Sequence, residues 1–581
     1  MEPIITSKNA TEISKNPSRT SHGKKILLIF FLTLAVLLPS AILIELSIHH
    51  GRNPTTNTTH PNPSPHSIIN ETCTKTLYPS LCFNTLSSIP ASVRVTTTQN
   101  ILEISINETV KSVQSSRSNI STLFTHQDLI SHEKNALNDC MEMMDQTHYE
   151  LGQAVKEIQN FSDLTGFFHQ FYGELKTLLS AAMTNENTCI EGISDVEEAN
   201  PETQKGLKVY LQNLLNPISK MISNCLAIVK HMESFSPGQK MMITRTPSDG
   251  FPLWMTARDR KLMEIVPEIR PNVIVASDGS GDYRSINEAV RMAPNMSINR
   301  YVIKIKAGVY KENVEISREK ANIMLVGDGM DSTVITGCKN FFDGFSTFNS
   351  ATLTVIGNRF LARDLTIINT SGPEKHQAVA LRVTSDSAFY KCNFTSYQDT
   401  LYAHSLRQFY SRCTIQGTID FIFGNAAAVF QNCLILVRKP NPDQKNMITA
   451  QGREDPNQNT GISLQNCIIK AAPDLVEAGT GIFFTFLGRP WRNFSRTIVM
   501  KSYLGDLIHP QGWHEWNQYS TLDTVEYIEY MNVGPGSDTR GRVAWGWYNR
   551  NISEEIAKQF TVGKFLHGAD DWLESTGFPF F

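Results

Sequence analysis

The sequence predicts two unlike folded parts, an all-α four-helix bundle followed by an all-β right-handed parallel β-helix. Residues 70–235 carry apolar residues at three- and four-residue steps, the period of an amphipathic helix. From residue 273 onward, short β-branched and aromatic runs alternate with Gly, Asn and Asp turns. Within this second part, similar residues return about every 20 positions, which is typical of a solenoid.

The bulk composition limits the classes of function. A chain of 581 residues is too long for one hydrophobic core, so more than one domain is expected. Lys and Arg number 53 against 56 Asp and Glu, which gives a net charge of −3. This balance provides no basic surface for nucleic acid, and no nucleic-acid partner is expected.

The N-terminal region has the pattern of a membrane-targeting segment. Residues 26–44 are uncharged and mostly apolar, and they are long enough to span a bilayer. Basic residues precede them, so residues 1–25 are predicted to be a cytosolic tail. We predict a transmembrane signal anchor; the alternative is a cleaved signal peptide. Residues 45–69, rich in Pro, Asn and Thr, are predicted to be a linker.

Glycosylation sequons support a secretory route for everything after that segment. Disulfides persist along this route, which makes the ten cysteines candidates for pairing. Ten Asn-x-Ser/Thr sequons lie beyond residue 50, at Asn57, Asn70, Asn107, Asn119, Asn160, Asn295, Asn369, Asn393, Asn493 and Asn551.

Cysteine spacing suggests disulfides in the helical part. Cys73 and Cys82 bracket the segment TKTLYPSL and are predicted to form a disulfide that closes a small hairpin. Cys140 and Cys189 can form a disulfide between two helices, which leaves Cys225 without a predicted partner.

In the second part, cysteines recur in phase with the repeat. Cys392, Cys413, Cys433 and Cys467 each open a similar triplet, such as Cys-Thr-Ile and Cys-Leu-Ile. Stacked neighbours fall inside disulfide range, and we predict Cys413–Cys433. Cys392–Cys413 fits the geometry nearly as well, and buried stacked thiols are the third alternative.

A junction separates the two parts. Residues 236–263 are predicted to be a linker, and residues 264–581 the β-helix. The basic run RDRKLM at 258–263 predicts a processing site near Arg260, Lys261, Leu262 and Met263.

The clearest chemical signal is a pair of residue types repeated at a 21-residue step. Gln377 and Gln398 are 21 residues apart, and so are Asp399 and Asp420. One solenoid turn stacks such residues about 4.8 Å apart. Two adjacent carboxyls are expected to divide into one that is ionised and one that holds a proton, which supplies a nucleophile and a general acid.

The two glutamines indicate which reaction these carboxyls serve. Amide N–H groups suit an oxyanion that develops on an acyl carbon, which favours acyl transfer over glycoside cleavage. Gln398 and Asp399 are adjacent, however, and would face opposite ways in a regular strand. A bend must therefore re-aim one of them.

A second cluster lies at 487–491, with the sequence LGRPW. Arg489 can pair with a carboxylate in forked geometry and keep it ionised. Trp491 offers a flat face for a sugar ring.

Several motifs resemble known plant families. The segment CTKTLYPSLC at 73–82 resembles the opening of the invertase/pectin methylesterase inhibitor family of four-helix bundles. Five later segments resemble plant pectin methylesterases in order and spacing; these are GVYKE (308–312), QAVAL (377–381), YQDTLY (397–402), DFIFG (420–424) and LGRPW (487–491). The whole chain thus resembles a pectinesterase precursor with an inhibitor-like pro-region.

The resemblance implies a carboxylic ester hydrolase, an aspartyl esterase that removes methyl groups from galacturonate in pectin and modifies the cell wall. Asp420 would be the nucleophile. Asp399 would protonate the departing methanol and then activate water. Gln377 and Gln398 would stabilise the transition state at the oxyanion.

Substrate contacts follow from the same resemblance. Arg489 would orient Asp420, Trp491 would carry a sugar ring, and Thr347 would be a further contact. No cluster with metal-ligand spacing occurs in the sequence, and no cofactor is expected.

The resemblance also implies partners and location. The expected partners are methylesterified homogalacturonan, the chain's own autoinhibitory pro-region, a processing protease of the secretory pathway, and inhibitor proteins. The expected location is the cell wall, reached from a membrane-anchored precursor.

Two other classes remain open from the residues alone. A polygalacturonase of the inverting kind would need carboxylates about 6.5–9.5 Å apart, and a pectate lyase would need several acidic Ca²⁺ ligands. Alternatively, the chain could act mainly as a binding or inhibitory module that captures a partner esterase. Methanol release without chain shortening would separate the esterase from all of these.

Overall fold

The computed structural model describes residues 65–87, 96–126, 129–161, 168–199, 206–235, 270–517, 522–546, 548–549 and 551–566. The predicted tail and membrane segment, most of the first linker, and the junction with its processing site lie outside these residues. Among the helices in the described ranges, none is long and apolar enough to cross a bilayer.

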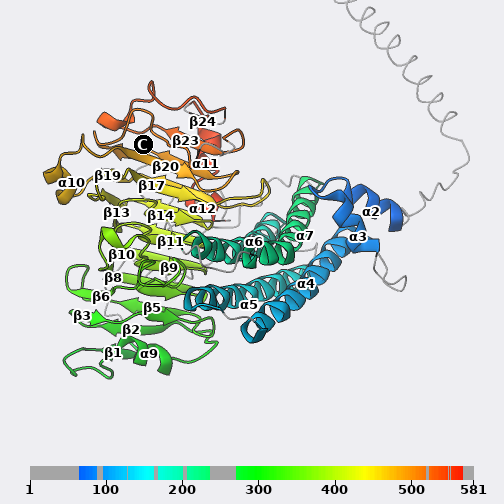
Figure 1. Cartoon of the computed structure of the whole chain (residues 1–581), viewed down its shortest axis with the longest axis horizontal. Helices are drawn as coiled ribbons and strands as arrows, with labels where there is room; N and C mark the ends of the chain where they lie inside the picture. Colours follow the sequence, from blue (N-terminus) through cyan, green and yellow to red (C-terminus); the bar gives the residue numbers. More distant parts are fainter. Residues whose placement is uncertain are drawn as a thin grey trace, which may run out of the picture. The chain divides into compact units, whose positions relative to one another are not determined.

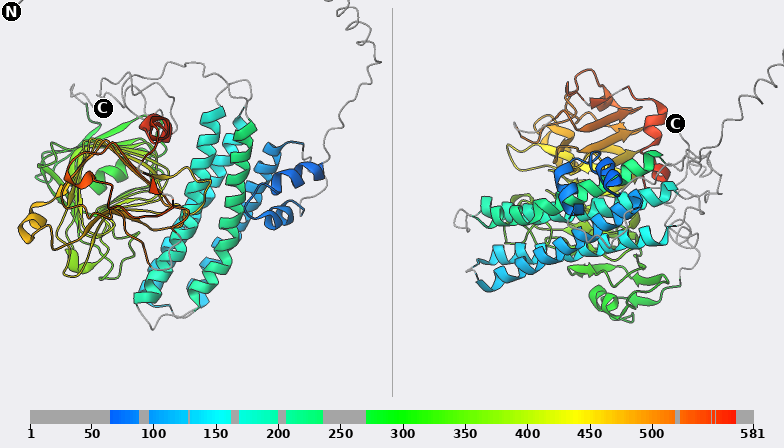
Figure 2. Two further views of the ribbon diagram at one scale, coloured as in Figure 1. Left: turned by 90° about the horizontal axis from the view of Figure 1, so that it is seen from above. Right: turned by 90° about the vertical axis from the view of Figure 1, so that its right-hand side faces the viewer.

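In the part of the chain that the structure describes, the helical region has four long helices and two short ones (Figure 1). The long helices lie side by side as a bundle, as the views of Figure 2 show. The predicted bundle is therefore present, with a short helical pair added at one end. The bounds are α2 Pro65–Cys73, α3 Pro79–Ser87, α4 Thr98–His126, α5 Ser131–Asn160, α6 Phe168–Ala199 and α7 Leu207–Phe235.

Both disulfides predicted for this part are present. Cys73–Cys82 joins α2 to α3, and Cys140–Cys189 joins α5 to α6. Cys225 on α7 is a buried free thiol.

Removing the Cys140–Cys189 bond in a C140A/C189A variant is expected to lower the free energy of unfolding of the bundle by about 3 kcal/mol. The bond closes a long loop and restricts the unfolded chain. Thermal unfolding followed by circular dichroism would measure the loss. The control is Cys225→Ala, which removes a buried sulfur without opening a cross-link; an equal shift in both variants would contradict the cross-link argument.

The second part is a parallel β-helix, as predicted. Neighbouring strands in this part run parallel to one another. Figure 2 shows the coils viewed along their axis. The sheet that carries the site has seven strands: β4 Val314–Ile316, β7 Leu353–Val355, β9 Leu381–Val383, β11 Leu401–Ala403, β14 Ile422–Gly424, β17 Asn446–Gln451 and β20 Thr485–Pro490.

The remaining strands form the other faces of the coil and are linked into one 17-stranded sheet. They are β1 Val273–Val275, β2 Tyr301–Ile305, β3 Gly308–Lys311, β5 Ile323–Val326, β6 Thr333–Gly337, β8 Phe360–Asn369, β10 Ser387–Thr395, β12 Arg407–Ser411, β13 Thr414–Gly417, β15 Ala427–Gln431, β16 Leu434–Val437, β18 Gly461–Gln465, β19 Ile468–Ala471, β21 Arg496–Met500, β22 Tyr503–Leu504, β23 Glu526–Tyr530 and β24 Tyr548–Asn549. Short helices also belong to this part: α9 Ile286–Met292, α10 Pro473–Ala478, α11 Glu554–Lys558 and α12 Val562–Phe565. They pack against the coil, α9 against β1, β2 and β4, α10 against β19 and α12 against β15.

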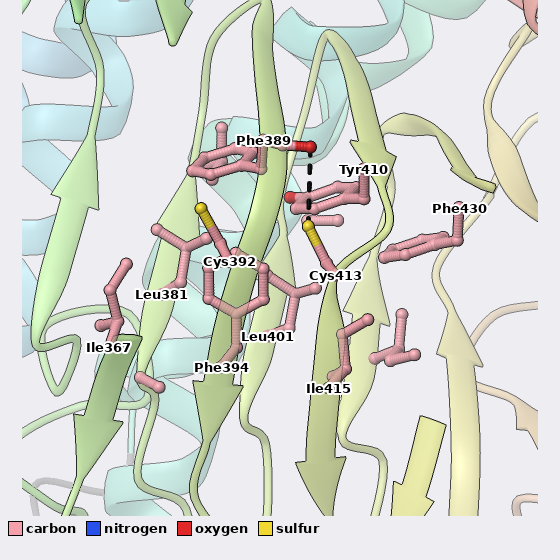
Figure 3. Close-up of a cluster of buried hydrophobic side chains, with 14 of the residues drawn as sticks. Ile367, Leu381, Phe389, Cys392, Phe394, Leu401, Tyr410, Cys413, Ile415 and Phe430 are labelled. Atoms are coloured by element: carbon pink, nitrogen blue, oxygen red, sulfur yellow. Dashed lines mark hydrogen bonds between the residues drawn. The ribbon is translucent and has the colours of Figure 1, made fainter. Parts of the chain in front are cut away.

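Stacking of like residues fills the interior of the coil (Figure 3). The Phe389 and Tyr410 rings stack at 5.0 Å, and the Tyr410 and Phe430 rings at 4.5 Å. On another face of the coil, Leu401 pairs with Leu381 before it and Ile422 after it, at steps of 20 and 21 residues. The sequence repeat is thus the length of one coil.

The predicted Cys413–Cys433 disulfide is wrong. Cys392, Cys413, Cys433 and Cys467 are all buried free thiols. The Cys413 thiol donates to the carbonyl of Phe389 at 3.5 Å, as Figure 3 marks, and the other thiols of the column make similar contacts. In-register side chains point the same way, so their Cβ atoms stay near the strand spacing of about 4.8 Å. A disulfide needs about 3.5–4.5 Å between Cβ atoms.

Candidate active site

A cavity of about 210 Å³ lies where helices α5 and α6 meet the seven-stranded sheet. It brings together all seven site residues that the sequence predicted: Thr347, Gln377, Gln398, Asp399, Asp420, Arg489 and Trp491. Further lining comes from Ser346, Phe348, Tyr402, Phe423, Ala450 and Trp516. The bundle contributes Asp139, Met143, Thr188, Glu191, Gly192 and Asp195.

One row of the seven-stranded sheet forms the floor beneath this site. Arg382, Tyr402, Phe423, Ala450 and Arg489 occupy the same register position on strands β9, β11, β14, β17 and β20. Adjacent coils are about 4.8 Å apart, so this row runs along the axis of the β-helix, across the strands.

Asp420 and Arg489 form a forked ion pair. Nε of Arg489 donates to one carboxylate oxygen at 2.9 Å, and Nη2 donates to the other at 2.5 Å. Asp420 is 5% exposed, and such a buried carboxylate needs a compensating charge. The guanidinium supplies that charge and fixes the plane of the carboxylate.

Asp399 lies beside this pair in a different electrostatic state. Burial, and then the neighbouring Asp420, raise the pKa of Asp399 well above its usual range, although Arg489 opposes the shift. Asp195 from the bundle adds to the increase. The cavity therefore holds a carboxylate paired with an arginine next to a carboxyl whose pKa is raised.

A backbone feature shared by both aspartates explains how Gln398 and Asp399 reach one cavity. Asp399 has φ 63° and Asp420 has φ 49°, both in the left-handed region. Asp tolerates this region better than most residues. The chain therefore bends at the same place in two successive coils, just before strands β11 and β14. A bend was expected here, because in a regular strand the adjacent Gln398 and Asp399 would face opposite ways.

Close packing just after Asp420 depends on Gly424. Its φ is 124°, and a Cβ there would lie 2.0 Å from the carbonyl oxygen of Ala403. Gly424→Ala is therefore expected to displace β14 and lower the stability of the β-helix by about 2–3 kcal/mol, with loss of activity. Thermal unfolding together with an activity assay would measure this. The control is Gly481, where an added Cβ would meet open space, and G481A should leave both values unchanged.

The predicted oxyanion donors and one substrate contact also lie at the cavity. Gln377, Gln398 and Thr347 are each partly exposed there. Gln398 is held by its backbone, because its carbonyl accepts from the N–H of Ala378 in the preceding coil at 3.2 Å. These amides are thus placed beside the carboxyls on a regular scaffold.

Aromatic side chains form one wall of the cavity, more extensively than the sequence suggested. Trp491 and Trp516 lie 6.4 Å apart between ring centroids, and the Arg489 guanidinium lies 4.1 Å from the centroid of Trp516. The Tyr402 and Phe423 rings stack at 4.2 Å. Trp516 was not predicted, because it lies beyond the repeats in a segment without a motif.

The bundle closes the cavity through polar contacts that sequence reasoning also missed. Thr188 lies 3.0 Å from Nε2 of His404, and Asn425 donates to Thr184 at 2.9 Å. Burial lowers the pKa of His404 to about 3, with Arg382 adding to the effect, so its ring is neutral. These contacts join residues more than 200 positions apart in the chain, for which no local pattern exists.

Comparison with known proteins agrees with the geometry. The Pectinesterase family model matches residues 272–569, and the Plant invertase/pectin methylesterase inhibitor model matches residues 67–228. Pectinesterase 3 of Citrus sinensis is 45% identical over 99% of this chain and 97% of its own length. Pectinesterase/pectinesterase inhibitor U1 of Solanum lycopersicum is 45% identical over 89% of each chain.

A solved structure resembles the second part. Pectin methylesterase from carrot is 54% identical, with a TM-score of 0.52. The match covers 99% of the carrot chain and 55% of this one. Nearly the whole of the solved carrot chain is therefore matched by little more than half of this chain.

Proposed function

The chain belongs to the pectinesterase family of carboxylic ester hydrolases, and we propose that Asp420 is the nucleophile that removes methyl groups from galacturonate in pectin. The observation that carries this assignment is the forked Asp420–Arg489 pair beside a carboxyl that keeps its proton. Arg489 pairs with both carboxylate oxygens of Asp420 and fixes their direction, and Asp399 supplies the acid.

In the first step, a carboxylate oxygen of Asp420 attacks the C6 carbonyl carbon of the ester. The carbonyl oxygen gains the electron pair and receives N–H bonds from Gln377 and Gln398. When the tetrahedral intermediate collapses, the C–O bond to the methoxy group breaks, and Asp399 gives its proton to that oxygen. Methanol leaves, and the acyl group remains on Asp420 as an anhydride.

In the second step, water clears the acyl group. Asp399, now ionised, takes a proton from the water, and the water oxygen attacks the acyl carbon. The bond to Asp420 breaks, which regenerates its carboxylate, and Asp399 is again protonated. Trp491 and Trp516 offer flat faces to the sugar rings, and Thr347 is a further contact.

The test is to incubate the β-helix, residues 270–581, with highly methylesterified pectin and to follow methanol and chain length together. Methanol without new chain ends is the expected result. New reducing ends would instead indicate a polygalacturonase, and new unsaturated ends a lyase. Absence of all three products would leave a binding module as the function.

The bundle is proposed to be an autoinhibitory pro-region that is released in the secretory pathway. Its α5 and α6 side chains line the catalytic cavity, so pectin and the bundle compete for one space. Processing is proposed within residues 236–263, by a protease of that pathway. The mature enzyme then acts in the cell wall, after a stage in which residues 26–44 anchor the precursor.

Glycosylation is proposed for exposed sequons only. The exposed sequons among the described residues are Asn70, Asn107, Asn119, Asn160, Asn295, Asn493 and Asn551. Asn369 is 2% exposed, and its amide donates to three carbonyls inside the β-helix, a geometry that leaves no room for a glycan.

A further inference from the structure

The last coils of the β-helix, around β23 and β24 in Figure 1, contain a buried ion pair that the proposed chemistry does not use. Glu529 lies on β23 with a side chain that is 2% exposed, and the Arg542 side chain is 1% exposed. Nε and Nη2 of Arg542 donate to the two carboxylate oxygens at 2.8 and 3.0 Å. The carbonyls of Pro510 and Gly536 accept further bonds from the guanidinium. Burying two charges is costly even when they are paired, which points to a role beyond packing.

The same carboxylate holds the indole of Trp513. Nε1 of Trp513 donates to Glu529 at 3.3 Å, and the hydroxyl of Tyr548 donates to the same oxygen at 3.0 Å. Trp513 is fully buried, and its ring stacks on Tyr527 with the centroids 4.3 Å apart. A ring that is stacked on one face and hydrogen-bonded at its edge is held in one orientation. The ion pair therefore helps to fix where the backbone of Trp513 lies.

Trp513 belongs to the turn of the coil that follows β20. It forms a parallel bridge with Gly488 of that strand. The N–H of Leu487 donates to the carbonyl of Gly512 at 2.7 Å, and the N–H of His514 donates to the carbonyl of Gly488 at 3.0 Å. These two backbone hydrogen bonds couple the position of Trp513 to that of β20.

Arg542 also packs directly on the same segment. Gly512 has φ 68°, and a Cβ there would lie 2.3 Å from Cδ of Arg542. The N–H of Val543, the next residue, donates to the carbonyl of Gln511 at 3.1 Å. The ion pair thus holds residues 511–513 through their backbone as well as through the indole.

The functional residue next to this arrangement is Arg489. It follows Gly488 directly in β20, and its guanidinium lies 4.1 Å from the ring centroid of Trp516, three residues after Trp513. The fork that Arg489 offers to Asp420 needs two N–H groups in the plane of the carboxylate. A small displacement of β20 or of Trp516 would therefore lengthen one arm of this fork.

We propose that Glu529, Arg542 and Trp513 are positioning residues for the esterase reaction, which keep the Arg489 guanidinium in the plane of the Asp420 carboxylate. The inference rests on the proposed function, because it assumes that Asp420 attacks the ester. The three residues are not among those that line the catalytic cavity, so they act through β20 and residues 512–516 and not on the substrate. Their loss should lower kcat and leave KM unchanged.

The test combines Trp513→Phe with Arg489→Lys in a double-mutant cycle. The whole chain is expressed in plant cells, and the secreted protein is assayed for methanol release from highly methylesterified pectin. Trp513→Phe keeps an aromatic ring but removes the N–H donor, and it should lower kcat about tenfold with KM within about twofold. Arg489→Lys, whose ammonium cannot form the fork, should lower kcat about 100-fold. Adding Trp513→Phe to Arg489→Lys should then lower kcat by less than about twofold, since no fork is left to misalign.

The matched control is Trp545→Phe. Trp545 is a second tryptophan against Tyr527, with the ring centroids 5.9 Å apart, and it is partly exposed. In the described part of the chain it is not among the residues that pair with β20. This variant should leave kcat and KM unchanged.

The cycle separates positioning from a purely structural role. If Trp513→Phe lowered kcat by the same factor with and without Arg489→Lys, or left kcat unchanged in the parent protein, the positioning role would be overturned. Should Trp513→Phe fail to fold by circular dichroism, Arg542→Lys decides the matter in the same cycle, because it keeps the buried positive charge but removes the fork to Glu529. Absence of methanol with the parent protein would refute the proposed function, and this inference with it.

Discussion

Replacing Asp420 by asparagine is expected to reduce kcat of the released β-helix by at least about 10⁴-fold, the range seen when a catalytic nucleophile is removed. Asparagine keeps the volume and one hydrogen-bond acceptor but offers no carboxylate to attack the ester. It also leaves the Arg489 guanidinium without its counter-charge. Methanol release from highly esterified pectin measures the loss, with circular dichroism to confirm folding.

The matched control for this experiment is Asp443→Asn. Asp443 is an exposed aspartate with φ 63°, so it shares the left-handed backbone of Asp420 but does not line the cavity. This variant should retain full activity. If Asp420→Asn kept a tenth or more of the parent rate, Asp420 could not be the nucleophile, and the roles of the two aspartates would have to be exchanged.

Strict coil periodicity explains why so much of the site was predictable from the sequence. Residues 20 or 21 positions apart in the sequence lie next to each other in successive coils, so a contact can be predicted from the separation alone. Asp399 and Asp420 could be placed side by side for this reason. The left-handed φ that turns Gln398 and Asp399 toward one cavity could not be predicted, because Asp adopts that conformation only in some contexts.

Contacts outside the repeat could not be deduced in the same way. The wrong Cys413–Cys433 pair shows that periodicity gives the neighbour of a residue but not a Cβ–Cβ distance short enough for a disulfide. Trp516 reaches the cavity from a segment without a repeat. The bundle wall depends on tertiary docking between residues such as Thr188 and His404, which no local pattern encodes.

Forcing the bundle away from the catalytic part is expected to activate the uncleaved chain by about 30-fold or more. Thr188→Arg places a long charged side chain where Thr188, 8% exposed, meets the neutral ring of His404. Disruption of one well-buried interface position typically costs about 2 kcal/mol or more, and each 1.4 kcal/mol corresponds to about tenfold in affinity. Methanol release by the full chain measures the effect. Ser121→Arg, at an exposed position of α4, is the control and should not activate.

The pH dependence of the uncleaved chain gives an independent check of the same docking. Burial raises the pKa of Asp139 to about 7, against the opposing effects of Ser346 and Arg382. Burial likewise raises the pKa of Glu150 to about 8, although Arg318 opposes it. Both carboxyls hold their protons more tightly when the bundle is docked on the β-helix. Docking is therefore strongest at a pH below their ordinary pKa values of 3.8 and 4.5, and it weakens as the pH rises through the docked pKa values of about 7 and about 8.

The uncleaved chain should therefore gain activity between about pH 5 and pH 8 more steeply than the released β-helix does. The ratio of the two activities at each pH isolates docking, because any titration of the catalytic groups themselves cancels. In Thr188→Arg this ratio should be nearly flat, since the bundle no longer docks. If the activity ratio of the unmodified chain did not change with pH, Asp139 and Glu150 would remain buried whether or not the bundle covers the cavity. The bundle would then not leave the cleft as one rigid body.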